Sequence, residues 1–181
     1  MSAHAGRFEV EPPPAYAAWL LVGLGGALPL AAIGLALWST RGAFAWRPLL
    51  PALLLLPVVV GLLLFALRRH SVELRDGVLD VRAALFRKRV PASGIDTARA
   101  RIVDLDERTE LRPLLKTKGM SLPGYHAGNF RLRGGFAKAF CLVTGRKRVL
   151  WLPLRDGTSQ LLLSLSQPQA LLDALRHPPA R

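Results

Sequence analysis

The hydrophobic positions of this chain follow two different patterns along its length. The first part holds two long runs without a charged side chain, at residues 15–38 and 48–67. A bilayer core of roughly 30 Å takes about 20 residues at the rise of an α-helix, so each run is long enough to cross it. In hydrocarbon such a segment satisfies its own backbone hydrogen bonds as a helix. The pattern therefore predicts two transmembrane helices, at 15–38 and 48–67.

Long apolar runs also occur in cleaved signal peptides and in the buried helices of soluble proteins. A signal peptide has a basic leader and an apolar core of about 7 to 15 residues. This leader carries Glu9 and Glu11 beside Arg7, and the first run is longer than such a core. Buried helices of soluble proteins normally keep a polar stripe, which neither run has. A signal peptide and a pair of buried soluble helices are therefore both disfavoured.

After His70 the pattern changes to short alternating runs, which are typical of β-strands. The first two runs flank Asp76-Gly77, a pair that readily adopts the positive φ angles of a two-residue hairpin turn. The charged segment 104–118 fits either a loop or a short helical piece. Strands are expected at 72–75, 79–82, 85–90, 98–103, 129–133, 136–144, 148–154 and 158–165.

Glycines between these runs predict how the strands connect. They punctuate the sequence as a meander of antiparallel strands, which indicates a roughly seven-stranded sandwich or partly open barrel. Ser166 and Gln169 have the spacing of a helix capping box, and the leucines after them fall on one helical face. The mainly-β domain should therefore end in a C-terminal amphipathic α-helix.

Charge is distributed as unevenly as hydrophobicity. The chain has 25 Lys and Arg against 12 Asp and Glu, a net charge of +13, and 22 of the basic residues follow position 67. Basic residues next to spans are retained in the cytoplasm, and an anionic leaflet attracts them. We therefore expect a multi-pass protein of the plasma (inner) membrane with both termini cytoplasmic. Its parts are an N-terminal tail at 1–14, a membrane α-helical hairpin within 15–67, and a cytoplasmic β domain at 68–181.

Several of these segments resemble the bacterial pleckstrin-homology-like (PH) domain family of membrane-anchored proteins. The resemblance covers roughly residues 70 to 177 and implies a partly open seven-stranded barrel capped by the helix, with a role in binding. Eukaryotic relatives of that fold often grip phosphoinositides with basic residues of the first hairpin, which here turns at Asp76-Gly77, so a phosphoinositide role is disfavoured. The segments that carry the resemblance are 72–82, 90–95, 119–130 (with Leu122-Pro123-Gly124-Tyr125) and 163–166.

Residue types used in catalysis and metal binding are present but scattered. The four histidines show no ligand spacing and Cys141 has no neighbouring ligand, so neither a metal nor a cofactor is expected. Thr144-Gly145-Arg146-Lys147 lacks the length of a phosphate loop, and no Gly-x-Ser-x-Gly elbow occurs. The sequence therefore does not predict an enzyme.

The candidates for binding are basic clusters and one glycine-rich segment. Segment 119–128 is interpreted as a loop, which is either a ligand-contact loop or a tight connection whose glycines allow unusual φ angles. The basic clusters are either headgroup contacts or a solvated surface. The candidate lipid- or partner-contact residues are Arg68, Arg69, Arg87, Lys88, Arg89, Tyr125 and His126.

These patterns together predict a membrane-anchored, non-catalytic binding module. Its partners would be the lipid bilayer, anionic lipid headgroups or a membrane protein at the cytoplasmic face. The alternative is a subunit or scaffold of a membrane protein complex that assembles through the helical hairpin. No nucleic-acid partner is expected, because the tether holds the basic surface beside the membrane.

Overall fold

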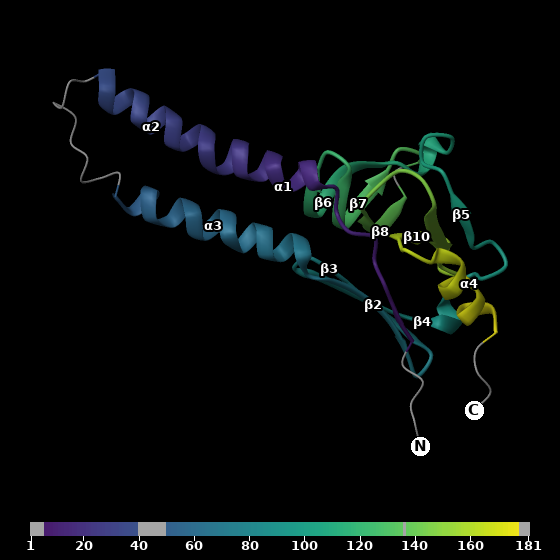
Figure 1. Ribbon diagram of the computed structural model, residues 1–181. Helices are drawn as coiled ribbons and strands as arrows, with labels where there is room; N and C mark the ends of the chain where they lie inside the picture. The colour runs from purple at the N-terminus through teal and green to yellow at the C-terminus, as the bar shows by residue number, and fades with distance from the viewer. Residues whose placement is uncertain (1–5, 40–49, 136, 178–181) are drawn as a thin grey trace. The chain divides into compact units, whose positions relative to one another are not determined.

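The computed structural model describes residues 6–39, 50–135 and 137–177, and the chain divides into two compact units (Figure 1). One unit is the apolar segment Ala15–Arg68. The other is a β domain that joins Met1–Pro14 to Arg69–Arg181. The apolar segment is therefore an insertion between the first strand of the β domain and all the others.

The apolar unit is helical throughout its described part. It consists of α1 (Ala15–Val22), a π-helical turn η1 (Gly23–Ala27), α2 (Leu28–Ser39) and α3 (Leu50–Arg68). Among the described residues one stretch, Ala15–Leu35, is long and apolar enough to cross a membrane, whereas the stretch Leu53–Leu67 is shorter. Helix length thus supports one span and does not establish the predicted hairpin. The connecting segment 40–49 lies outside the described residues.

Glycines bring the two helical stretches of this unit together. A Cβ atom added at Gly25 would lie 3.7 Å from Cγ2 of Val60, and one added at Gly26 would lie 3.9 Å from the same atom. Large apolar side chains elsewhere on both stretches are exposed, among them Trp19 and Leu54. A helix that is apolar on every side needs apolar surroundings.

The first sheet of the β domain is antiparallel, with the strand order β1-β2-β3-β4. The predicted hairpin turn is confirmed, because Asp76 and Gly77 have φ angles of 50° and 72°. β1 comes from the N-terminal tail and was not predicted. The four strands are β1 (Gly6–Phe8), β2 (His70–Arg75), β3 (Val78–Ala83) and β4 (Phe86–Pro91).

The second sheet has the order β5-β9-β10-β8-β7-β6. β8 and β10 are parallel neighbours, because β9 lies on the far side of β10. The predicted antiparallel meander is therefore wrong here, and the domain has ten described strands in two unclosed sheets rather than about seven. The strands are β5 (Arg101–Val103), β6 (Pro113–Leu122), β7 (Tyr125–Leu132), β8 (Lys138–Val143), β9 (Val149–Pro153) and β10 (Ser159–Ser164).

The glycine-rich segment 119–128 is not a loop but the tip of the β6–β7 hairpin. Gly119 and Gly128 are directly paired. A Cβ atom on Gly128 would overlap the carbonyl oxygen of Lys118 and lie 3.2 Å from the ring of Phe86. Gly128 also has a φ angle of 115°, which favours glycine. Gly119 and Gly128 therefore let the backbones of β6 and β7 approach closely. For these two glycines the structure supports the interpretation as a tight connection.

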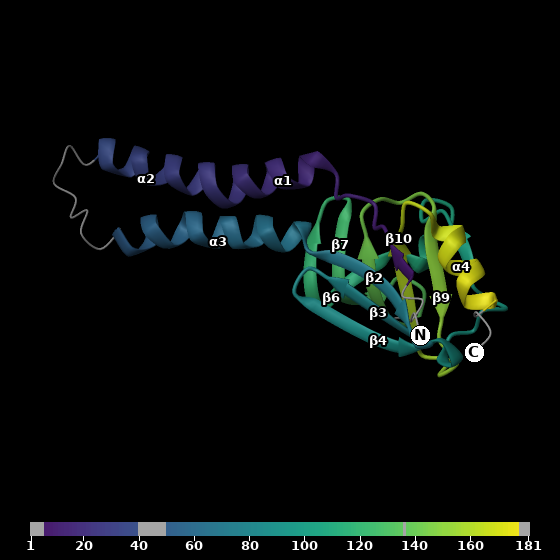
Figure 2. The same ribbon diagram turned by 60° about the horizontal axis from the view of Figure 1, so that its bottom comes forward.

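The two sheets form two layers, with β2, β3 and β4 crossing in front of the six-stranded sheet (Figure 2). On one face of the larger sheet, Phe130, Cys141 and Trp151 belong to a buried cluster with Leu105 and Leu111 from the connection after β5. The segment 104–118, which fitted either a loop or a short helical piece, is a connection with a 3₁₀ turn, η4 (Thr109–Leu111), only as far as residue 112. Its second half, residues 113–118, belongs to strand β6, so the expectation is wrong there.

The predicted C-terminal helix is confirmed as α4 (Pro168–Arg176), which buries Leu171, Leu172 and Leu175. The predicted capping box is wrong. Gln167 is the N-cap residue and makes no side-chain capping bond. In a capping box the side chain of Gln169 would bind the backbone N–H of Ser166. Here that N–H donates to the carbonyl of Glu9 in the N-terminal tail, and Gln169 donates to Asp173.

Candidate functional site

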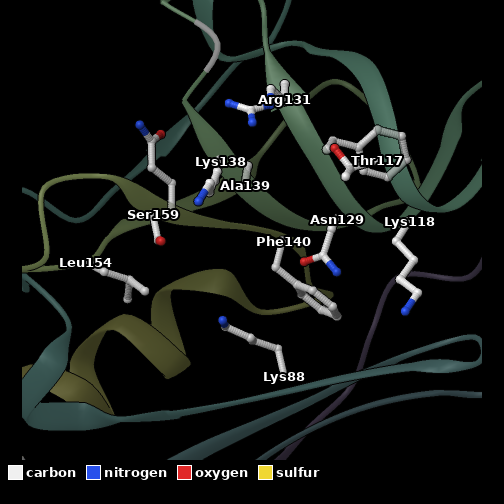
Figure 3. Close-up of a pocket in the computed structure, with 12 residues that line it drawn as sticks. Lys88, Thr117, Lys118, Asn129, Arg131, Lys138, Ala139, Phe140, Leu154 and Ser159 are labelled. Carbon is white, nitrogen blue, oxygen red and sulfur yellow. The ribbon is translucent and has the colours of Figure 1, made fainter.

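A pocket of about 270 Å³ lies where the two sheets of the β domain face each other (Figure 3). β4 contributes Lys88 from one side, and Figure 3 shows Phe140, Asn129 and Lys118 lying on the other. No acid is among the described residues that line it. These lining residues are Lys88, Thr117, Lys118, Asn129, Phe130, Arg131, Lys138, Ala139, Phe140, Leu154, Ser159 and Gln160.

Strand register explains how the polar side chains gather here. Asn129 of β7 is paired with Lys118 of β6 and with Phe140 of β8. Two residues further along the same face, Lys138 of β8 is paired with Arg131 and with Ser159 of β10. Directly paired residues point to the same side of a sheet. Two short rows of side chains therefore form the floor of the pocket. One row is Lys118, Asn129 and Phe140. The other is Arg131, Lys138 and Ser159, in which two cations are neighbours.

A β-bulge places Thr117 beside this floor. The register of β6 shifts between Lys116 and Lys118, so Thr117 is an extra residue opposite β7. In a regular strand, neighbouring side chains point to opposite faces. A bulge redirects a side chain, and bulges are frequent next to binding sites. This irregularity is how two consecutive residues of β6 both line the pocket.

The pocket carries an excess of positive charge. Within the described part of the chain, Lys88, Lys118 and Lys138 form no ion pair. Asp156 lies within electrostatic range of Lys88, and its pKa is held below its usual range mainly by hydrogen bonds from the backbone N–H groups of Ser159 and Thr158, and to a smaller extent by Lys88. These N–H groups donate to its Oδ1 over 2.8 and 2.9 Å. Asp156 therefore neutralises the pocket only in part.

A second basic surface lies on the outer face of the four-stranded sheet. Arg87 donates to both carboxylate oxygens of Asp80, over 2.8 Å from Nε to Oδ1. Arg89 Nε and Arg82 Nη2 lie 3.6 and 3.8 Å from Oδ2 of the same carboxylate. The hydrogen bond from Arg87 holds the pKa of Asp80 below its ordinary value. One carboxylate thus organises three guanidinium groups and leaves a net positive surface.

The β3–β4 turn is fixed to the residue that follows the apolar segment. The backbone N–H of Ala84 donates to the carbonyl oxygen of Arg69 over 2.9 Å, and Arg69 directly follows the last residue of α3. Leu85, at the tip of this turn, is 67% exposed. Arg82 and Arg87 lie on either side of the turn and are paired across the two strands. An exposed leucine flanked by arginines is therefore held close to Arg69 within the β domain.

The predicted contact residues whose side chains the structure describes do not form one site. Arg87 and Arg89 lie on the outer face, whereas Lys88 between them points to the pocket, because side chains alternate along β4. Arg69 is exposed, and the side chain of Arg68 lies outside the described residues.

Tyr125 and His126 lie in the β6–β7 hairpin and do not offer an open contact surface. The side chain of Tyr125 is 0% exposed, and burial raises its pKa to about 12. His126 is half-buried, with Nδ1 3.0 Å from the hydroxyl of Ser121. Burial, and next the charge of Arg146, lower the pKa of His126.

Sequence reasoning missed the other cations of the pocket, Lys118, Arg131 and Lys138. Each lies within a strand, where single basic residues are normally on a solvated face. One pattern in the sequence could have indicated them. Polar residues such as Asn129 and Arg131 occupy every second position in runs whose other residues are apolar, so their side chains share one face of a strand.

Groups suited to catalysis do not converge in the described part of the chain. No three His, Cys, Asp or Glu side chains there are placed to hold a metal ion. Cys141 is fully buried, and burial raises the pKa of its thiol, which makes it a poor nucleophile.

No protein-family model, curated protein or solved structure matches the chain. The resemblance to the PH-like family therefore stays a prediction.

Proposed function

We propose that this protein is a membrane-anchored, non-catalytic binding module whose basic β domain contacts anionic lipid headgroups at the cytoplasmic face of the inner membrane. Two apolar helices anchor it as a hairpin, with both termini cytoplasmic. The pairing of β1 with β2 is the observation that carries this proposal. A binding role also agrees with the PH-like resemblance of residues 70 to 177.

β1 constrains the path of the apolar segment. Phe8 is paired with Val72, and Val10 forms a bridge with Leu165, so residues on both sides of the apolar segment belong to one folded unit. A single crossing would put β1 and β2 on opposite sides of the membrane. A signal peptidase that cut after α1 would remove β1 from its sheet. An apolar segment that stays uncleaved, enters the membrane and returns to the same side keeps β1 attached to the chain and on the same side as β2.

α3 is the segment that can make the return crossing. It contains 19 residues, which at helical rise gives about 28 Å, against a hydrocarbon core of about 30 Å. No charged residue interrupts it before Arg68. Its contact with Gly25 and Gly26 through Val60 agrees with two antiparallel spans that pack closely.

The β3–β4 turn is the part of the β domain best suited to contact lipid. Its hydrogen bond to Arg69 keeps it beside the residue that follows α3. A leucine side chain gains about 2 kcal/mol when it leaves water, and each basic residue near an anionic surface contributes about 1 kcal/mol. Leu85 would enter the interface, with Arg82 and Arg87 at the headgroups.

Reporters of topology test the anchor. One reporter follows the C-terminus and a second replaces part of the segment 39–47 between the helices. We expect the C-terminus in the cytoplasm and the segment 39–47 outside. Both reporters on the same side would exclude the hairpin, and an external C-terminus would exclude the cytoplasmic domain.

A fluorophore tests the lipid contact. The full chain with Leu85→Cys, labelled with an environment-sensitive dye, is placed in nanodiscs of phosphatidylcholine with or without phosphatidylglycerol. We expect a blue shift with phosphatidylglycerol that salt reverses and that Arg82→Gln with Arg87→Gln reduces. The matched control, Lys147→Gln with Arg155→Gln, removes two exposed charges elsewhere and should leave the shift intact. Equal spectra in both lipids would contradict the contact.

A further inference from the structure

We propose that the pocket between the two sheets of the β domain is a binding site for a small phosphate monoester. This inference goes beyond the proposed function, because the site lies between the two sheets, with its four cations exposed to solvent, and does not need the β domain to touch a membrane. The ligand's phosphate would lie between Lys88 of the four-stranded sheet and the cations of the six-stranded sheet.

The first argument is the placement of like charges. Arg131 and Lys138 are directly opposite each other on neighbouring antiparallel strands, an arrangement that destabilises a sheet. Lys118 and Lys88 complete a lining whose described residues include no acid. An anion between these groups turns the repulsion into attraction. Because four cations surround the space, a ligand with about two negative charges, as on a phosphate monoester at neutral pH, fits better than a single carboxylate.

The second argument is the supply of hydrogen-bond donors. Thr117, Asn129 and Ser159 line the pocket beside the cations. Thr117 reaches it because of the bulge in β6, and Ser159 is directly opposite Lys138 in the parallel pairing of β10 with β8. A phosphate group has three strong acceptor oxygens. Donors from three strands can therefore bind oxygens that the cations leave unsatisfied.

The third argument is the apolar part of the lining and its size. Phe140, Ala139 and Leu154 share the pocket with the polar groups. Figure 3 shows Phe140 pointing toward Lys88 across the space. A volume of about 270 Å³ is just below the range for small-molecule sites, roughly 300 to 1,000 Å³, so the ligand must be small. The fitting ligand is a phosphate monoester with a small apolar or aromatic group against Phe140.

Binding by the full-length chain in uncharged detergent micelles tests this inference. The probes are inorganic phosphate and phenyl phosphate, each titrated at constant ionic strength against chloride and followed by calorimetry and by the melting temperature. We expect saturable binding of both, tighter for phenyl phosphate, with a melting temperature that rises with probe concentration. No saturable binding of either probe overturns the proposal.

Lys138→Gln and Lys147→Gln form the matched pair of variants. Lys147 is exposed in the β8–β9 connection and does not line the pocket. We expect Lys138→Gln to weaken phosphate binding about tenfold, as expected for one lost charge-assisted contact, without lowering the melting temperature in the absence of phosphate. Lys147→Gln should leave binding unchanged. An equal loss in the two variants would mean general charge attraction and would overturn the proposal.

The phosphate could belong to a lipid headgroup or to a soluble ester, and a further probe separates these sources. Dioctanoyl phosphatidic acid is added to the same micelles, with dioctanoyl phosphatidylcholine as its control. Tighter binding of phosphatidic acid than of phenyl phosphate, with sensitivity to Lys138→Gln, supports a lipid source. Binding of phenyl phosphate alone supports a soluble ester. Because the dye at residue 85 reports membrane contact separately, failure of one proposal can be told from failure of the other.

Discussion

At the scale of single residues, Asp80 organises the outer face of the four-stranded sheet. Its carboxylate lies within ion-pair distance of Arg82, Arg87 and Arg89. We expect Asp80→Asn to lower the free energy of unfolding by about 1 kcal/mol, the scale of ion pairs near a surface, because three guanidinium groups lose their counter-charge. Urea unfolding of the full chain in micelles measures this loss.

The pH dependence of stability provides a second measurement on Asp80. Because folding lowers the pKa of this carboxyl, its contribution is present above the unfolded value of about 3.8 and is lost as pH falls through the folded value. The wild-type chain should therefore lose this part of its stability below about pH 4, whereas Asp80→Asn should lack that component. If the unfolding free energies of the wild-type chain and Asp80→Asn fell in the same way with pH, protonation of Asp80 would not be coupled to folding.

Gly128 is the residue whose lack of a side chain matters most for the β6–β7 pair. Its φ angle of 115° and the proximity of the β6 backbone leave no room for a Cβ atom. We expect Gly128→Ala to cost more than about 3 kcal/mol of unfolding free energy, since strain and overlap combine. Gly145→Ala is the control, because a Cβ atom there meets nothing within 4 Å. A loss of similar size at both positions would contradict this account.

At the scale of elements, β1 ties the N-terminal tail to the β domain. Val10 is buried and bridges Leu165, and Glu11 N–H donates to the carbonyl of Ser164. We expect Val10→Asp to cost about 3 kcal/mol, because it buries a carboxylate without a partner, and to increase cleavage of the β domain by protease. Arg7→Gln, at an exposed position of β1, should leave cleavage unchanged. If the two variants were cleaved equally, β1 would not contribute to the stability of the domain.

The elements that the sequence predicted well are those specified by local chemistry. Asp76-Gly77 favours a tight hairpin through its own φ preferences, and α4 follows from the spacing of its leucines. β1 could not be predicted in the same way. It has three residues, and the strand that pairs with it follows the entire apolar segment. The parallel pairing of β8 with β10 was also missed, because glycines mark where strands end and do not specify which strand lies between two others.

The candidate pocket was predictable only in part. Lys88 was singled out from a run of basic residues that the strand then divides between two faces. Lys118, Arg131 and Lys138 are isolated along the sequence and meet through pairings that join three strands, β6, β7 and β8. A bulge, which places Thr117, depends on how two strands fit together and leaves little trace in local composition.

At the scale of the whole molecule, the chain combines an apolar segment with a domain that carries most of the net charge of +13. Electrostatic attraction to a charged surface decays over about 8 Å at physiological ionic strength. Basic groups must therefore be held close to that surface to act. The bond between Ala84 and Arg69 provides such a restraint for the β3–β4 turn, because it fixes the turn to the residue after α3.

The insertion of the apolar segment after β1 also sets an order for biogenesis. Residues 6–10 leave the ribosome first, but their partners, β2 and Leu165, are made only after α3 and near the end of the β domain. Nascent chains grow at about 5 to 20 residues per second. Residues 6–10 therefore remain unpaired for several seconds, until β2 and Leu165 have been synthesised. Both helices would enter the bilayer while the domain is still unfolded. Ribosome-bound chains stopped before Ser164 should accordingly be protease-sensitive throughout the β domain, and protection of such chains would contradict this order.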